Sequence, residues 1–318
     1  MNQMDKIIAK QFPPLDYEAD RATHGHMEPV RLVRSRALAE GVSWQEWLYR
    51  RGDGADVWVY LTKIAAHAPV QLAVAAAPLW TSKRVTTHAR DFENFFGIPV
   101  LYAMNASFFH FFNNGDLTPY GIQVVRGVEM ARPGIVKDKP WYGYNFLAVD
   151  KAGKAFISNA DAYNAQLRGK LEYAVGGGMR LIREEKVYLY EDPLGKGFMP
   201  APRTAVGFDT EGNTILLCAD GRSKRSAGLT LADIIDIYRQ QGRITELLNL
   251  DGGGSTTVVL KDEAGNFRVE NVPSGTALPV NNVRYDIEKK EPQGDEMVRA
   301  VADAVLIIPK QNSKETTL

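Results

Sequence analysis

Residues 249–260 read NLDGGGSTTVVL: one carboxylate, Asp251, is followed by three glycines and a hydroxyl-rich, β-branched segment. This order predicts a strand, a tight turn and a second strand, because glycine tolerates positive φ and lets the backbone approach a ligand closely. Successive turn amides can also point at an anion. We therefore expect Asp251 at the mouth of a groove with a backbone floor. A glycine-rich hairpin without chemistry is the alternative.

The same stretch does not fit a phosphate-binding P-loop. That motif needs a lysine before its Ser or Thr and a helix after it. Here Gly254 stands at the lysine position, and residues 258–260 have the β-branched character of a strand.

The composition bounds the class of protein. The chain has 318 residues, of which 45% are hydrophobic and 24% charged, enough for one large domain or two small ones. Lys+Arg and Asp+Glu both number 38, so the bulk charge predicts neither a nucleic-acid nor a membrane partner. The one cysteine, Cys218, lies in an apolar run and is expected to be a buried small side chain rather than a nucleophile.

The predicted domain covers residues 38–309. Residues 1–37 are polar and are expected to form an N-terminal arm, and residues 310–318 a tail. His24 and His26 in the arm have no third ligand candidate beside them, so a solvated arm is favoured over a metal site. With no apolar run of about 18 residues and no leader-like segment, we expect a cytoplasmic protein, with a phage-encoded setting as an option.

The predicted fold class is α+β. Strand patterns dominate, which indicates a mainly antiparallel, curved sheet in a single domain with a few packed helices. One helix is expected over residues 86–96, where it stops at Gly97. Another is expected to start at the cap Thr230 and to end at Gly242.

Several strand ends carry polar residues. Arg203 begins one predicted strand, and Asp220 and Arg222 follow the end of the next. Asn105 ends a buried strand just before two phenylalanines, and residues 176–178 form a second triple glycine. Each feature alone also fits a local turn or a packing role.

Taken in order, the segments 203–207, 220–222, 228–231 and 249–257 resemble the phosphodiester glycosidase family. Further resemblances complete the series: Asn105 with Phe108 and Phe109, Gly176–Gly178, Asn271 with Pro273 and Ser274, and Arg299 with Val301. The resemblance covers roughly residues 38–309. The insertion-like segment 275–297 departs from the family pattern and leaves sugar selectivity open.

The resemblance implies a hydrolase that cleaves the glycosidic bond of a sugar-1-phosphodiester, of the GlcNAc-1-phosphodiester or nucleotide-sugar kind. Asp251 is assigned as nucleophile or base near C1, and Asp220 as the acid or as the group that orients an arginine. Arg203, Arg222 and Arg299 are assigned to the phosphate, which a guanidinium fork can grip at two oxygens. The remaining substrate-binding assignments are Asn105, Asn249, Gly177, Gly178, Gly252, Gly253, Gly254, Ser255 and Thr256, of which the Asn, Ser and Thr side chains either bind sugar hydroxyls or order the loop.

Two other functions stay open at this point. Asp220 and Asp251 could hold a divalent cation in a metal-dependent phosphodiesterase, although histidines and clustered carboxylates are scarce. A non-catalytic carbohydrate-binding or virion module could also keep this fold. No cofactor is predicted, a divalent cation is not excluded, and the expected partner is a small or polymeric glycosyl-phosphate; the oligomeric state is not predicted.

Overall fold

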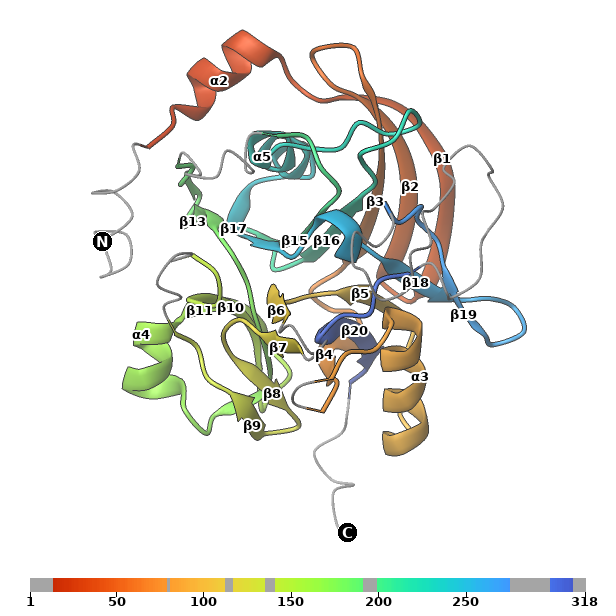
Figure 1. The fold of residues 1–318 in the computed structure, drawn as a ribbon, viewed down its shortest axis with the longest axis vertical. Coiled ribbons are helices and arrows are strands. Elements are labelled where there is room, and N and C mark those ends of the chain that lie inside the picture. Colours follow the sequence, from red (N-terminus) through yellow and green to blue (C-terminus); the bar gives the residue numbers. More distant parts are fainter. Residues whose placement is uncertain are drawn as a thin grey trace.

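The computed structural model describes residues 14–78, 81–111, 117–134, 141–190, 199–274 and 298–310. The predictions for the start of the arm, for the 275–297 segment and for most of the tail lie outside these residues. Figure 1 shows the arrangement of the described elements.

The largest sheet has eight strands in the order β1-β2-β3-β16-β15-β17-β13-β14. All its neighbouring strands pair antiparallel. Its strands are β1 (Glu28–Ala39), β2 (Val42–Arg50), β3 (Asp56–Ile64), β16 (Thr214–Ala219), β15 (Arg203–Asp209), β17 (Ile244–Leu250), β13 (Arg180–Arg183) and β14 (Lys186–Val187).

Two five-stranded sheets and one strand pair complete the β-structure. One sheet contains β19 (Phe267–Val269), β18 (Val258–Lys261), β5 (Tyr102–Asn105), β20 (Asp303–Pro309) and β4 (Val70–Ala76) in that order. The other contains β11 (Ala155–Asn159), β10 (Asn145–Asp150), β12 (Leu171–Gly176), β8 (Gln123–Val125) and β9 (Val128–Ala131), and β6 (Phe109–Phe111) pairs with β7 (Leu117–Pro119). The predicted α+β class with antiparallel pairing is confirmed, with the strands divided among several sheets.

Helices and helical turns complete the described structure. They are α2 (Tyr17–His24), α3 (Val85–Phe96), α4 (Ala160–Ala162) with the π-helical turn η1 (Tyr163–Leu167), α5 (Leu231–Gln240) and the 3-10 turn η2 (Gly253–Ser255). As predicted, α3 ends at Gly97 in the left-handed conformation, and Thr230 and Asp233 form a capping box at the start of α5. None of the described helices is long and apolar enough to cross a membrane.

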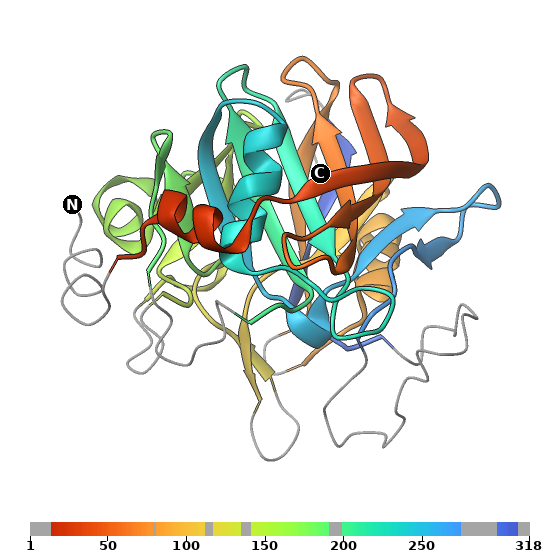
Figure 2. The same cartoon turned by 90° about the horizontal axis from the view of Figure 1, so that it is seen from above.

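The central strands of the large sheet are buried on both faces because they are apolar at successive positions. On β16, Leu216 and Cys218 face the core shared with the β4/β5/β20 sheet. Ile215 and Leu217 face the opposite core, which α5 covers (Figure 2). The pKa of the Cys218 thiol is raised to about 12 by burial, so this residue is an inert part of the core.

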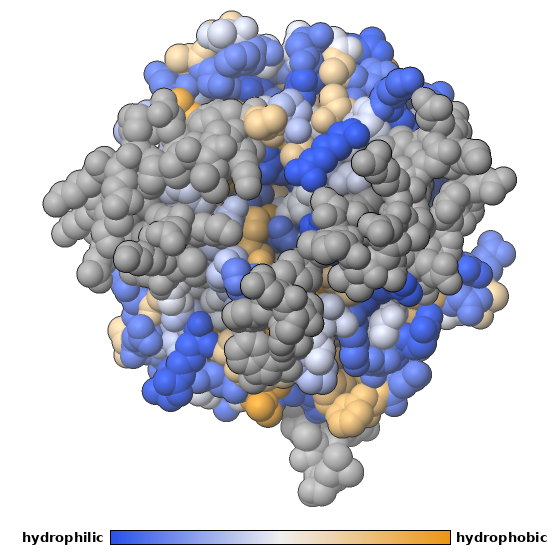
Figure 3. Space-filling model, in the orientation of Figure 1, coloured by the Kyte–Doolittle hydropathy of each residue, from blue (hydrophilic) through white to orange (hydrophobic). Residues whose placement is uncertain are grey.

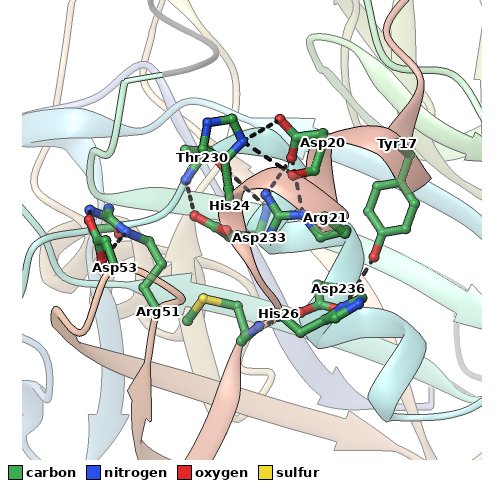
Figure 4. Close-up of polar contacts among 12 residues, drawn as sticks. Tyr17, Asp20, Arg21, His24, His26, Arg51, Asp53, Thr230, Asp233 and Asp236 are labelled. Carbon is green, nitrogen blue, oxygen red and sulfur yellow. Dashed lines mark hydrogen bonds and ion pairs between the residues drawn. The ribbon is translucent and has the colours of Figure 1, made fainter.

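Residues 17–39 belong to the folded domain, which differs from the predicted arm. β1 pairs with β2 as an edge strand with three irregularities in register, and most of its side chains are exposed. Helix α2 is held to α5 by polar contacts: the buried Arg21 donates to Asp233 of α5 at 2.7 Å (Figure 4). An exposed edge strand and a polar helix contact leave no apolar periodicity, so the sequence pattern did not reveal either element.

Residues 249–260 form the predicted strand, turn and strand, but not a hairpin. β17 lies in the eight-stranded sheet, whereas β18 pairs with β5 and β19 in the neighbouring sheet. The η2 turn between them therefore crosses from one sheet to the other. Asp251 stands at this crossing, which rules out the plain hairpin.

Candidate active site

Asp251 follows the end of β17 and is fixed by its backbone. Its N–H donates to the Ala106 carbonyl at 2.9 Å, and its carbonyl accepts a hydrogen bond from Asn105 Nδ2 at 2.6 Å. The residue as a whole is partly exposed. The crossing turn thus presents the carboxylate from a rigid backbone.

The surroundings of Asp251 favour its protonated form. Burial raises the pKa of this carboxyl to about 6; hydrogen bonds from Ser255 and from the Gly252 amide and the charge of Arg299 oppose the shift, and Asp303 adds to it. A carboxyl that titrates near neutral pH can exchange a proton at physiological pH, as catalytic carboxyls do.

Arg222 and Arg299 lie together beside Asp251. A Cβ atom at Gly253 would stand 3.1 Å from Arg222 Nη1, so this guanidinium lies over the glycine turn. Arg299 Nη1 donates to Ser255 Oγ at 3.3 Å, and burial and the nearby Arg222 charge lower the pKa of Arg299. Neither arginine forms an ion pair with a carboxylate within 4.0 Å in the described part of the chain. Two adjacent guanidinium groups favour an anion between them.

Asn105 holds the crossing turn in place through buried hydrogen bonds. It is fully buried, and its Oδ1 accepts hydrogen bonds from Thr204 Oγ1 at 3.0 Å and from the Thr257 amide at 3.1 Å. With its amide group donating to Asp251, it ties β5, β15 and the crossing turn together. Ser255 and Thr256 are likewise buried, so the loop-ordering role is the one that the contacts of these three residues support.

The glycines allow close approaches. Gly253 has φ +62°, and a side chain at Gly252 would meet the Pro202 carbonyl oxygen at 2.6 Å. Gly254 is buried within η2. Gly177 packs against Leu248, and a Cβ at Gly178 would meet the Phe108 ring at 2.8 Å. The triple glycines therefore make room for neighbouring side chains as well as for neighbouring backbone.

Arg203 begins β15 next to the crossing turn, where a Cβ atom at Gly252 would stand 3.5 Å from its Cα. Its Nε donates to Leu229 O and its Nη2 to Met199 O, both at 2.9 Å. Side chains alternate along a strand, so Thr204 points to Asn105 while Arg203 points to the loop that leads into α5. These contacts support a structural role for Arg203, and its predicted phosphate contact stays a prediction.

Asp220 is enclosed by protein donors. It is 2% exposed, and its carboxylate accepts hydrogen bonds from Tyr60 Oη at 2.9 Å, Asn271 Nδ2 at 3.1 Å and the Val272 amide at 3.0 Å. Burial raises its pKa to about 6. No hydrogen bond or ion pair within the described part of the chain joins it to Arg222, so the contacts favour a structural role over the predicted acid or arginine-orienting role.

Asp303 is a carboxylate near Asp251 that the sequence reasoning missed. It is 1% exposed and accepts hydrogen bonds from the Ser107 amide at 2.8 Å and Gln123 Nε2 at 2.9 Å. Its neighbour Ala304 pairs with Asn105 across β20 and β5. Asp303 is the first residue of β20, so a search for acidic residues next to every apolar run would have found it.

Three aromatic side chains, Phe108, Tyr120 and Tyr142, lie near the segment that follows Asn105. Phe108 stacks on Tyr142 with ring centroids 4.1 Å apart and an interplanar angle of 11°. The ring centroids of Tyr120 and Tyr142 are 6.0 Å apart. Asn249, which is 6% exposed, lies beside Gly178, and its Oδ1 has no hydrogen-bond partner among the residues that the structure describes. Tyr120 and Tyr142 come from loops whose sequences carry no site-like pattern, so only the fold reveals them.

The donor set does not match the predicted metal alternative. Both oxygens of Asp220 face protein donors, and no group of three or more His, Cys, Asp or Glu side chains that could hold a metal occurs among the described residues. The hypothesis that Asp220 and Asp251 bind one cation together is therefore not supported by the contacts of these residues.

Comparison with known sequences gives a family. A model described as phosphodiester glycosidase matches residues 99–308. The mouse N-acetylglucosamine-1-phosphodiester alpha-N-acetylglucosaminidase is 45% identical over 65 residues, which are 20% of this chain and 12% of that protein. The SPbeta prophage-derived uncharacterized protein YomE of Bacillus subtilis (strain 168) is 38% identical over 74 residues, 23% of this chain and 11% of that protein. The alignments thus span only a small part of these relatives.

Comparison with solved structures shows a shared fold. The catalytic domain of the zebrafish N-acetylglucosamine-1-phosphodiester alpha-N-acetylglucosaminidase has a TM-score of 0.59 at 19% identity, covering 90% of this chain and 88% of that chain. A hypothetical protein from Synechocystis has a TM-score of 0.52 at 17% identity, covering 88% and 64%.

Proposed function

Because the chain belongs to the phosphodiester glycosidase family, we propose that it is a hydrolase that cleaves the C1–O bond of a sugar-1-phosphodiester. The observation that carries the proposal is the pair Arg222 and Arg299 beside Asp251 at a glycine turn. A phosphodiester bound by the arginines would place the anomeric carbon next to the carboxylate.

The leaving group of this reaction needs little help from an acid catalyst. When water replaces the phosphate at C1, the departing phosphate monoester is already a good leaving group, and the arginines stabilise its growing charge. Asp251 would act in its ionised form, either as the nucleophile that bonds to C1 or as the base that takes a proton from water. One accessible carboxylate is therefore sufficient, which agrees with the enclosed position of Asp220.

Asp303 would tune Asp251 through its charge. Its charge raises the pKa of Asp251, and hydrogen bonds from Ser107 and Gln123 hold it in place. Asn105 would position the backbone of Asp251. We assign both as positioning residues in this proposal.

The deciding experiment is to incubate the protein with UDP-GlcNAc, with and without EDTA, in ¹⁸O-labelled water. Cleavage at C1 would release UDP without label and GlcNAc with one labelled oxygen. Label in the phosphate, or loss of turnover in EDTA, would favour the metal-dependent phosphodiesterase. Absence of turnover with UDP-GlcNAc and with simple GlcNAc-1-phosphodiesters would favour a binding module.

A further inference from the structure

Phe108, Tyr120 and Tyr142 form a patch that the proposed chemistry does not use; we call it the aromatic platform. All three side chains are half-buried. Phe108 and Tyr142 stack nearly parallel, and Tyr120 lies tilted beside them. Aromatic faces left partly exposed next to a catalytic carboxylate are typical of sites for flat or apolar ligand faces.

The backbone holds this platform rigidly. The Tyr120 amide donates to the Phe108 carbonyl at 2.7 Å, and the Gly143 amide donates to the Gly177 carbonyl at 2.8 Å. Gly121 and Gly143 approach so closely that a Cβ on Gly143 would meet Gly121 N at 2.5 Å. A preformed platform loses little conformational entropy when a ligand binds.

The platform and the arginines lie along the same short segments. The Asp251 amide is bonded to Ala106, two residues before Phe108, while Arg222 covers Gly253 two residues after Asp251. The buried Asn249, with its unpartnered Oδ1, lies next to Gly178 and so borders the space beside Phe108. The backbone contacts of Asp251 thus lead within two residues to the arginine at Gly253 and to Phe108 of the platform, which Asn249 borders.

We infer that the aromatic platform is the sugar subsite, on which a pyranose ring packs its C–H face while Asn249 accepts a hydrogen bond from a sugar O–H or N–H. This inference rests on the proposed function, because only a phosphate at Arg222 and Arg299 places the sugar on the platform side of Asp251. A nucleobase of the leaving group would lie on the arginine side.

Two substrates that carry the same sugar show whether the platform binds the sugar or the nucleobase. UDP-GlcNAc carries a nucleobase, whereas the methyl ester of GlcNAc-1-phosphate carries none. We expect Tyr142→Leu and Phe108→Leu each to lower kcat/KM about tenfold for both substrates, the scale of one lost aromatic contact. Tyr188→Leu, at a half-buried tyrosine packed on the α5 side of the sheet, should change neither. A loss confined to UDP-GlcNAc, or full activity of both platform variants, would overturn the inference.

A binding measurement keeps the inference separate from the proposed function. Calorimetric titration with GlcNAc-1-phosphate and with inorganic phosphate measures what the sugar adds. The wild type should bind the sugar phosphate about tenfold more tightly, and Tyr142→Leu should remove that difference. If no substrate is turned over but the difference is present, the proposed function fails and the sugar subsite stands. Turnover without any such difference would reject the sugar subsite and leave the proposed function intact.

Discussion

The Arg222 guanidinium lies against Gly253: a Cβ atom on the glycine would stand 3.1 Å from Nη1 and 3.2 Å from Nη2 of the arginine. Both residues have positive φ, 60° and 62°. The crossing turn between the two sheets and the anion site are therefore one packed unit. Any side chain at Gly253 would both strain the backbone and displace the guanidinium.

We accordingly predict that Gly253→Ala and Gly253→Val reduce kcat/KM by at least about tenfold, because the arginine is moved. Gly265→Ala is the matched control. Gly265 also has positive φ, but no atom lies within 4 Å of its Cβ position, so it tests backbone strain alone. We expect it to lose about 1 to 2 kcal/mol of stability in denaturant titration with kcat/KM unchanged. Equal effects of both substitutions on kcat/KM would contradict the packed-unit interpretation.

The arginines are predicted to differ in role. Arg222→Lys keeps the charge but loses the two-pronged guanidinium. The resulting fall in kcat/KM should correspond to a loss of roughly 1 to 3 kcal/mol of transition-state stabilisation. Arg203→Lys should instead lower the free energy of unfolding, by about 1 to 3 kcal/mol, because it loses hydrogen bonds to Leu229 and Met199. Steady-state kinetics and denaturant titration on both variants check this. A kinetic loss in Arg203→Lys without a stability loss would restore the phosphate role of Arg203.

The pH dependence of turnover should report Asp251. Its pKa of about 6 and its action in the ionised form predict that kcat/KM rises with pH through about pH 6 and then levels off. Asp251→Asn should lower kcat/KM by at least about a hundredfold and abolish this limb, at nearly unchanged thermal stability. A rate that falls through pH 6 would instead make Asp251 the acid.

Asp220 should leave a signature in stability rather than in rate. Burial raises its pKa from the ordinary value of 3.8 to about 6, so between these values the native state binds more protons than the unfolded state. Its contribution to stability is then present at low pH and is lost as the pH rises through about 6. The stability of Asp220→Asn relative to wild type should therefore improve by on the order of 1 to 3 kcal/mol between pH 4 and pH 7. A difference that is constant with pH in denaturant titrations would refute this.

The contact of α2 with α5 is predicted to be strongly stabilising. Arg21→Met removes the guanidinium that pairs with Asp20 and with the buried Asp233, at a cost of about 3 to 5 kcal/mol. Arg243→Met breaks an exposed pair with Glu185 and should cost about 1 kcal/mol or less. Denaturant titrations of the two variants give the comparison. If Arg21→Met is no more costly than Arg243→Met, residues 17–24 are only loosely held.

The sequence by itself determined the elements whose cause is local. The glycines after Asp251 required a turn, Gly97 and the Thr230 capping box fixed helix ends, and apolar alternation marked the central strands. The same local patterns placed Asp251 and Arg222 among the candidate site residues, whereas Arg299 entered through the family resemblance. Their signal lies within a few residues of chain, where periodicity and turn chemistry act.

Only the tertiary structure decided which of these candidates meet. The alternation of β15 turned Arg203 to the α5 side, and the donors Tyr60, Asn271 and Val272, distant in sequence, enclosed Asp220. Pairing of β20 with β5 brought Asp303 to the site, and α2 joined the domain through ion pairs that leave no apolar pattern. Each of these outcomes depends on contacts between residues far apart in the chain, which no local pattern encodes.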